Sequence, residues 1–197
     1  MLFYIICIFG GDAAIILLNI FALKNNFAQD SAYSSSYLLI AGLLLIVVLV
    51  AIDGLSAFLI RRLPEKWFSY KVKFHKVEKK ECKFYEHLGI KYWKDHILEL
   101  GMFTAFSKKH VQNPESPEYF ERFILESNYG AVIHIAGVFL GFLILFIYPR
   151  NLLFSMSLPA AIINAVMNIF PFMILRYNLP RLERMRAILV KKQSRGR

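Results

Sequence analysis

Five polar side chains stand inside apolar stretches of this sequence, in places where they could carry out group-transfer chemistry. They are Asp12, Asp53, His134, Asn164 and Asn168. Polar groups are expensive in hydrocarbon, so they usually face a protein partner or a cavity. These residues therefore predict a polar pocket inside a bundle of membrane helices.

The types of these side chains suit acyl transfer to a hydroxyl group. Such a reaction needs a base for the hydroxyl proton and a hydrogen-bond donor for the developing oxyanion. His134 is the candidate base, because an imidazole with a pKa of about 6.5 is largely neutral at working pH. The side-chain N–H groups of Asn168 and Asn164 are the candidate donors.

Three carboxylates could assist His134. Glu126 precedes it by two helical turns on the same face, a separation of about 12 Å along a helix axis. That is too far for a direct hydrogen bond within one helix. Asp53 or Asp12, on another helix, would then have to orient the imidazole, or Glu126 acts elsewhere.

Small residues would let the polar groups approach one another. His134, Gly137 and Gly141 share one helical face, and the Gly137-x-x-x-Gly141 step is typical of closely packed membrane helices. Asn164 and Asn168 share a face of the next apolar segment. Because the connection between the two segments is very short, we expect an antiparallel hairpin in which the two polar faces meet.

The composition identifies a membrane protein. The chain has 197 residues, 57% of them hydrophobic, with a mean hydropathy of +0.46, and the apolar residues are gathered in blocks. A helix needs about 20 residues to cross the hydrocarbon core of a bilayer. We predict an all-α protein that forms a single membrane domain over residues 1–197. Its four spans are expected at residues 2–23, 37–60, 129–148 and 152–175.

The cations set the expected orientation. All but two of the 24 Lys and Arg residues lie between the second and third spans or after the fourth. By the positive-inside rule, the segment 61–128, the basic tail 176–197 and the N-terminus are cytoplasmic in a multi-pass protein of the cell membrane. The net charge of +10 then indicates anionic lipid headgroups as partners rather than nucleic acid.

Aromatic residues alternate with cations in the first part of the segment 61–128. This composition predicts a layer in the membrane interface, with rings at headgroup level and ammonium groups in water. Such a layer could be an anchor or a lid over the substrate. Ser116, Pro117 and Glu118 suit the N-cap, the first helical position and the first turn of a helix. A helix should therefore begin at Pro117 and continue into the third span.

A cluster of Arg, Tyr and Asn follows the fourth span directly and consists of Arg176, Tyr177, Asn178 and Arg181. Guanidinium groups bind phosphate in bidentate fashion. The cluster therefore predicts a site for an activated acyl donor, either the phosphates of acyl-CoA or the acidic surface of an acyl carrier protein. No bound cofactor is expected. The alternative for the more distal cations is a positive-inside anchor.

Several blocks of the sequence resemble one known family. Asn168-Ile-Phe-Pro171 with Arg176-Tyr-Asn-x-Pro-Arg-Leu182 resembles the end of the glycosyl-diaponeurosporenoate acyltransferase family. Earlier blocks occur in the same order: Arg62 to Phe68, Tyr85 to Gly101 with Trp93-Lys94-Asp95, and Glu126 with His134. The resemblance covers about residues 61–190. It implies an integral membrane enzyme of carotenoid (staphyloxanthin) biosynthesis, and it adds Trp93, Lys94 and Asp95 to the candidate substrate-binding residues.

The expected activity is transfer of a fatty acyl group from an activated donor to a hydroxyl of a lipid-linked sugar or similar amphiphile at the cytoplasmic leaflet. One alternative is another small lipid-modifying membrane enzyme, similar to isoprenylcysteine methyltransferases or steroid reductases. The other is a non-enzymatic, lipid-binding membrane scaffold. A metal centre is disfavoured, because the 5 histidines include no His-x-x-x-His pair.

Overall fold

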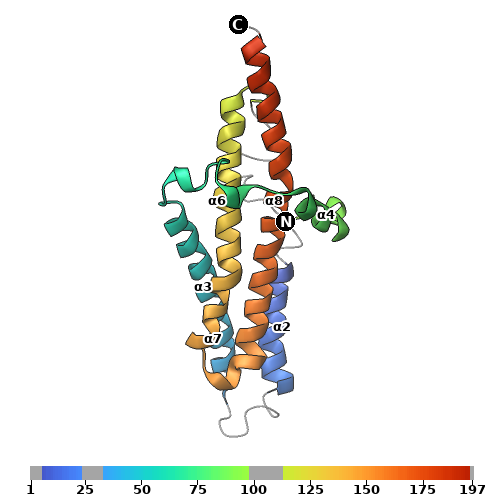
Figure 1. The fold of residues 1–197 in the computed structure, drawn as a ribbon. Coiled ribbons are helices and arrows are strands. Elements are labelled where there is room, and N and C mark those ends of the chain that lie inside the picture. Colours follow the sequence, from blue (N-terminus) through green and yellow to red (C-terminus); the bar gives the residue numbers. More distant parts are fainter. Residues whose placement is uncertain (1–5, 24–32, 98–112, 196–197) are drawn as a thin grey trace. The chain divides into compact units, whose positions relative to one another are not determined.

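The computed structural model describes residues 6–23, 33–97 and 113–195, and every regular element in these ranges is a helix (Figure 1). The predicted all-α class is confirmed. The chain divides into two compact units. Unit 1 comprises Met1–Phe58 with Ile135–Ile169, and unit 2 comprises Leu59–His134 with Phe170–Arg197.

Three helical segments are long and apolar enough to cross a membrane. They are α3 (Ser35–Ile60), the segment Pro117–Ile147 and the segment Arg150–Arg195. The second and fourth predicted spans fall within the first and third of them, and the predicted span 129–148 exceeds the second by one residue. The first predicted span contains the shorter helix α2 (Gly11–Leu18), between π-helical turns at Ile6–Gly10 and Asn19–Leu23. A membrane protein is thus supported, and the count of four spans stays a prediction.

Unit 1 has an apolar core built from α2, α3 and the two segments that join at the hairpin. Ile144, Met156 and Ala161 are fully buried in this core together with Leu45 of α3. Gly42 permits the close approach of α2 and α3, because a Cβ added there would collide with the side chain of Ile16. The apolar exterior of this unit suits lipid. Close packing of side chains, rather than the hydrophobic effect, therefore holds its helices together.

The predicted antiparallel hairpin is present within unit 1. Helix α6 (Pro117–Leu140) continues through a 3-10 turn (Gly141–Leu143) into α7 (Ile144–Ile147). Pro149 and a second 3-10 turn (Arg150–Leu152) reverse the chain, and a π-turn (Leu153–Ser157) leads into α8 (Leu158–Arg195). Asn19, which directly follows α2, donates to the carbonyl oxygen of Ser155 at 2.8 Å. This hydrogen bond connects the hairpin to the end of α2.

Unit 2 combines the first part of α6 and the last part of α8 with the short elements that follow α3. These elements are 3-10 turns at Glu65–Trp67 and Lys73–His75 and helices α4 (Lys79–His87) and α5 (Ile90–Trp93). Gly89 has a φ of 72° and lets the chain turn between α4 and α5. The predicted start of α6 is confirmed, because Ser116 Oγ accepts a hydrogen bond from the backbone N–H of Tyr119 at 3.1 Å.

The residues expected as a basic tail continue α8 as far as Arg195 (Figure 1). The helix includes Pro171 and Pro180, each of which removes one backbone N–H donor. Leu, Arg, Glu and Lys predominate after Pro180, and these residues favour helix. The fourth predicted span and the cluster after it are therefore parts of one helix.

Candidate active site and the acyltransferase family

The polar groups of unit 1 form one hydrogen-bonded cluster of Asp53, Asn164 and Asn168. The Nδ2 of Asn168 donates to Asp53 Oδ2 at 2.9 Å and to the carbonyl oxygen of Asn164 at 3.1 Å. Asn164 in turn donates through Nδ2 to the carbonyl oxygen of Gly137 at 3.3 Å. Both N–H groups of Asn168 are thus engaged by a carboxylate on α3 and by its own helix.

Gly137 permits this cluster to form. A Cβ added at Gly137 would lie 2.8 Å from Asn168 Oδ1 and 2.9 Å from Asp53 Oδ1, which is closer than real Cβ atoms approach. The Oδ1 of Asp53 is buried without a hydrogen-bond partner among the described residues. Asp53 therefore offers an unused acceptor oxygen beside Asn168, inside an otherwise apolar unit.

Asp12 is also buried in unit 1, with an exposed fraction of 7%. It lies in the first turn of α2, and the preceding Gly11 packs closely against Ile163 of α8. The sequence placed Asp12 and Asp53 as equivalent partners for the catalytic base. The hydrogen bonds of Asp53 with Asn168 distinguish the two aspartates.

Glu126 and His134 lie on the part of α6 that belongs to unit 2. Glu126 accepts from Arg61 at 2.9 Å and from Arg122 at 2.9 Å, so its carboxylate is held by two guanidinium groups. These two ion pairs favour the second expectation for Glu126, namely that it acts elsewhere than on His134. His134 is half-buried and in contact with a neighbouring group.

Arg176 is the most heavily bonded side chain of unit 2. Its Nε lies 2.5 Å from Glu81 Oε1 and its Nη2 lies 2.7 Å from Glu81 Oε2, a bidentate ion pair between α8 and α4. The carbonyl oxygens of Phe74 and Lys76 accept from Nη1 and Nη2 at 3.1 and 3.3 Å. With an exposed fraction of 8%, this guanidinium is satisfied by protein groups.

Glu81 also accepts a hydrogen bond from the hydroxyl of Tyr85 at 2.7 Å. Desolvation alone would raise the pKa of Glu81, but the hydrogen bonds from Arg176 and Tyr85 and the charge of Arg176 outweigh it and lower that pKa. Glu81 is therefore ionised at neutral pH. This pairing could not be predicted from the sequence, because Glu81 is one acid within a highly charged segment.

The other residues predicted to bind the acyl donor differ in their contacts and in their exposure. Tyr177 donates to Glu86 at 2.9 Å, and Lys94 lies over the Tyr177 ring at 5.6 Å. Trp93 packs edge to face against Phe170, with ring centroids 4.9 Å apart. Asn178 is half-buried, whereas Asp95 and Arg181 are exposed. Arg181 is thus the predicted phosphate-binding side chain of this cluster that faces outward.

A second pair of buried polar side chains in unit 2 escaped the sequence analysis. His75 donates through Nε2 to the carbonyl oxygen of Trp67 at 2.9 Å, which fixes the tautomer with a lone pair on Nδ1. That Nδ1 and the Oδ1 of Asn128 are buried and without partners among the described residues. Asn128 is held by a hydrogen bond to the carbonyl oxygen of Phe68 at 2.8 Å.

The environment of His75 keeps its imidazole neutral. Desolvation by burial lowers the pKa of His75, the hydrogen bond to Trp67 opposes that shift, and the nearby charge of Arg176 adds to it. A neutral imidazole with an unused lone pair is what a proton acceptor requires. His75 therefore joins His134 as a candidate base.

No group of three or more His, Cys, Asp or Glu that could hold a metal occurs among residues 6–23, 33–97 and 113–195. Of the residues that the sequence analysis discussed, Gly101 of the resemblance lies outside these ranges. The described residues offer carboxylate, imidazole, amide and guanidinium groups instead. These groups suit acid–base and anion-binding chemistry.

The long apolar helices and the buried amide, carboxylate and imidazole groups define a helical membrane protein with polar side chains in its interior. Residues 64–188 match the family of glycosyl-4,4′-diaponeurosporenoate acyltransferase. The chain belongs to this family, and membership places it among the acyltransferases, in a family of carotenoid biosynthesis. No curated protein and no solved structure matches the chain. The matched range includes His75, Glu81, Asn168 and Arg176, whereas Asp53 precedes it.

Proposed function

We propose that the protein moves a fatty acyl group from an activated thioester donor to a hydroxyl of a lipid-linked sugar or similar amphiphile at the cytoplasmic leaflet. The family membership supports acyl transfer over methyl transfer, reduction or a purely structural role. One observation supports assigning the proposed reaction to particular residues. It is the hydrogen bond between Asn168 and Asp53 inside an apolar unit. A polar pair of this kind inside membrane helices indicates a functional site.

Asn168 is the proposed oxyanion donor, and Asp53 is its positioning residue. In the structure Asp53 and the carbonyl oxygen of Asn164 accept the two N–H groups of Asn168. An acyl carbonyl oxygen would replace the weaker of these acceptors, the carbonyl of Asn164 at 3.1 Å. The retained bond to Asp53 would then fix the amide plane, which keeps the donor preorganised.

The base that takes the hydroxyl proton is proposed to be His134. His134 precedes Gly137 by three residues on α6, and Gly137 contacts the amide cluster. The base removes the proton of the acceptor hydroxyl, the oxygen attacks the thioester carbonyl, and the thiol of the donor leaves with that proton.

The donor is proposed to be acyl-CoA or an acyl carrier protein, held by the exposed Arg181 with the neighbouring Tyr177 and Asn178. Lys94 and Trp93 border this region within unit 2. Arg176 contributes to it indirectly, because its guanidinium is bound to Glu81. Its proposed role is to hold α4 in place beside the donor-binding residues.

The test is acyl transfer by purified protein in nanodiscs, with radiolabelled acyl-CoA or acyl carrier protein and a glycolipid acceptor, backed by comparative lipidomics of cells with and without the protein. We expect Asn168→Ala and His134→Ala to lose activity by about 100-fold or more, the scale of a lost oxyanion donor or base. Ile162→Ala is the matched control, because Ile162 lies on the same helix as Asn168 and is 49% exposed.

Full activity of both Asn168→Ala and His134→Ala would refute the assigned site. Loss of activity in Asn168→Ala, with His134→Ala fully active, would refute His134 as the base. A circular-dichroism melt of each variant shows whether a loss of activity reflects unfolding.

A further inference from the structure

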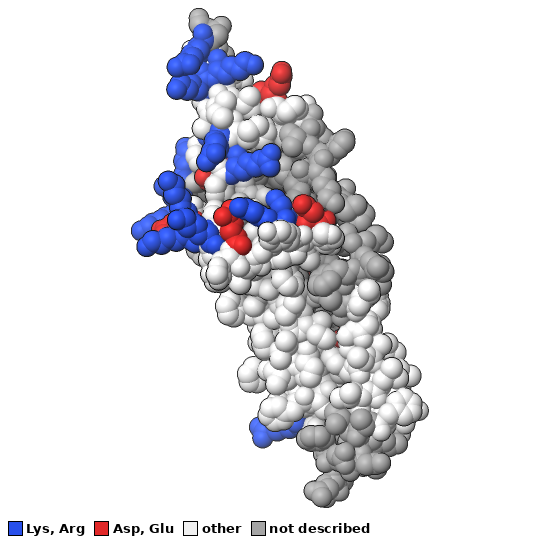
Figure 2. Space-filling view, turned by 90° about the vertical axis from the view of Figure 1, so that its right-hand side faces the viewer, with Lys and Arg blue, Asp and Glu red and all other residues white. Residues whose placement is uncertain are grey.

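Large apolar side chains are exposed on α4 and α5, between these helices and on the 3-10 turn before them, and we call this surface the outer face of α4 and α5. The exposed fractions are 64% for Phe74, 58% for Phe84, 46% for Leu88 and 85% for Tyr92. Lys80 and Lys83 are exposed among them. Figure 2 looks onto the side of the molecule that carries α4, and Lys and Arg cluster there beside uncharged side chains. Several large exposed apolar side chains within one short segment indicate an interaction surface.

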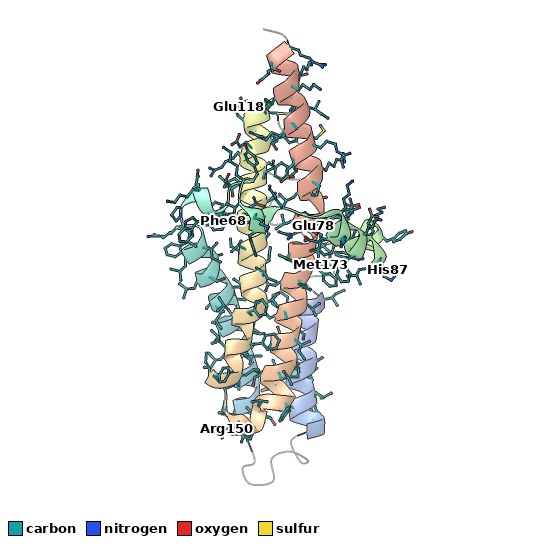
Figure 3. The ribbon with its side chains drawn as sticks, viewed as in Figure 1. Phe68, Glu78, His87, Glu118, Arg150 and Met173 are labelled. Atoms are coloured by element: carbon teal, nitrogen blue, oxygen red, sulfur yellow. The ribbon has the colours of Figure 1, made fainter. Side chains whose placement is uncertain are left out.

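The inner face of α4 is fixed to unit 2, so the outer face is presented in one orientation. Tyr85 is buried with an exposed fraction of 5%, and Glu81 is held by the bidentate pair with Arg176. Figure 3 labels Glu78, the N-cap residue of α4, His87, the last residue of α4, and Met173 of α8, the helix to which Arg176 belongs. Lys80, Lys83 and Phe84 lie three and four residues apart and share one face of α4, which differs from the face that carries Glu81 and Tyr85.

The chemistry of the outer face fits a lipid surface. Aromatic rings favour the headgroup level of a bilayer, and Lys side chains there reach the phosphates. The nine residues of α4 are too few to cross a membrane, and the chain enters this segment directly from the apolar helix α3, which ends at Ile60. An acidic protein partner would explain the lysines but not the exposed rings.

We propose that the outer face of α4 and α5 lies in the membrane interface and binds the phosphate headgroups of anionic lipids through Lys80 and Lys83. Glu86 of α4 is paired with Lys91 and with Tyr177, and Lys83 acts on it through its charge. Lys80 and Lys83 are both exposed, so their ammonium groups can reach lipid phosphate. Lys80 and Lys83 are neither among the proposed acyl-transfer residues nor among the proposed donor-binding residues.

The experiment uses a tryptophan placed on the outer face. Tyr92→Trp is combined with Trp67→Phe and Trp93→Phe, since these are the 2 tryptophans of the chain, and the protein is placed in nanodiscs containing brominated phosphatidylglycerol or brominated phosphatidylcholine. We expect lipids brominated near the headgroup to quench the fluorescence of this tryptophan strongly. Brominated phosphatidylglycerol should do so at a lower mole fraction than brominated phosphatidylcholine. Lys80→Gln with Lys83→Gln should remove this preference, a change of up to about 30-fold if each lysine contributes about 1 kcal/mol.

The matched control is Lys191→Gln with Lys192→Gln, near the end of α8, which should keep the preference for phosphatidylglycerol. Quenching by aqueous iodide without quenching by brominated lipid would overturn the proposal. Equal quenching by the two lipids would overturn the role of the lysines. Loss of quenching only on addition of acyl carrier protein, with no dependence on the lipid, would assign the surface to that protein instead. None of these readouts depends on acyl transfer, so each remains decisive if the proposed activity is wrong.

Discussion

Arg176 shows how one side chain can have a different use from the one that its sequence context suggests. It follows an apolar stretch, where an arginine would be free to bind a phosphate. In the structure a carboxylate and two backbone carbonyls take its donors. A guanidinium in such surroundings acts as an anchor, because releasing it would leave Glu81 unpaired within the protein.

This anchor predicts a large loss of stability in Arg176→Gln. Removing Arg176 from this part-buried ion pair leaves the charge of Glu81 without a cationic partner, and we expect the free energy of unfolding to fall by about 2 kcal/mol. Arg181→Gln, at an exposed position of the same helix, should change it by less than about 0.5 kcal/mol. Urea unfolding in detergent micelles measures both. Equal effects of the two variants would contradict the anchoring role.

His75 predicts a dependence of stability on pH. Its pKa in the folded protein is lowered below the ordinary value of 6.5, so the unfolded chain binds a proton that the folded protein does not. Its contribution to stability is therefore complete above pH 6.5 and is lost as the pH falls toward the folded pKa. Melting temperatures between pH 5 and pH 8 should fall on the acid side of this range.

The variant His75→Gln isolates this effect, since glutamine can keep the donor to the Trp67 carbonyl but does not titrate. We expect a flatter pH profile in His75→Gln than in the unmodified protein. His87→Gln, at an exposed histidine, should keep the original profile. A profile unchanged by His75→Gln would assign the pH dependence to other groups.

At the scale of helices, the approach of α3, α6 and α8 within unit 1 depends on the absence of side chains at particular positions. At Gly137 of α6, the carboxylate of Asp53 from α3 and the amide of Asn168 from α8 fill the space that a side chain would take. Close packing of this kind replaces the hydrophobic effect as a source of specificity between membrane helices.

The contrast between Gly137→Ala and Gly54→Ala tests this packing. A Cβ at Gly137 would overlap Asp53 and Asn168, whereas a Cβ at Gly54 of α3 meets nothing within 4 Å. We expect Gly137→Ala to lose about 1–3 kcal/mol and most of the acyl-transfer activity. Gly54→Ala should be neutral or slightly stabilising, because Ala favours helix over Gly. Thermal unfolding and the nanodisc assay report both effects, and equal behaviour of the two variants would disprove the contact.

For the whole molecule, the distribution of charge determines the expected placement in the cell membrane. Within the described residues of unit 1, Arg150 is the lone Lys or Arg, whereas unit 2 carries the other described cations. The positive-inside rule places the cation-rich segments in the cytoplasm and the turn at Arg150 outside.

Cysteine labelling tests this orientation. In a background with Cys7→Ala and Cys82→Ala, we expect Arg150→Cys to react with a membrane-impermeant maleimide in intact cells. Lys192→Cys should react only after the membrane is permeabilised. The reverse pattern would invert the orientation and would move the proposed acyl donor to the outer side.

The sequence alone determined the features that depend on local chemistry. Blocks of apolar residues predicted the helical class and three of the spanning segments, and Ser116 with Pro117 predicted the start of α6, because hydropathy and capping act over a few residues. Asn168 and Arg176 were likewise recognised as unusual from their positions beside or within apolar segments.

Only the tertiary structure decided the partners of these residues. Asn168 bonds to Asp53 and Arg176 bonds to Glu81, at sequence separations of 115 and 95 residues. The free acceptors of His75 and Asn128 also emerge only once the chain is folded. Such choices depend on which helices come together and on which donors other groups have already taken. Hydropathy and spacing along one chain segment carry no information about either.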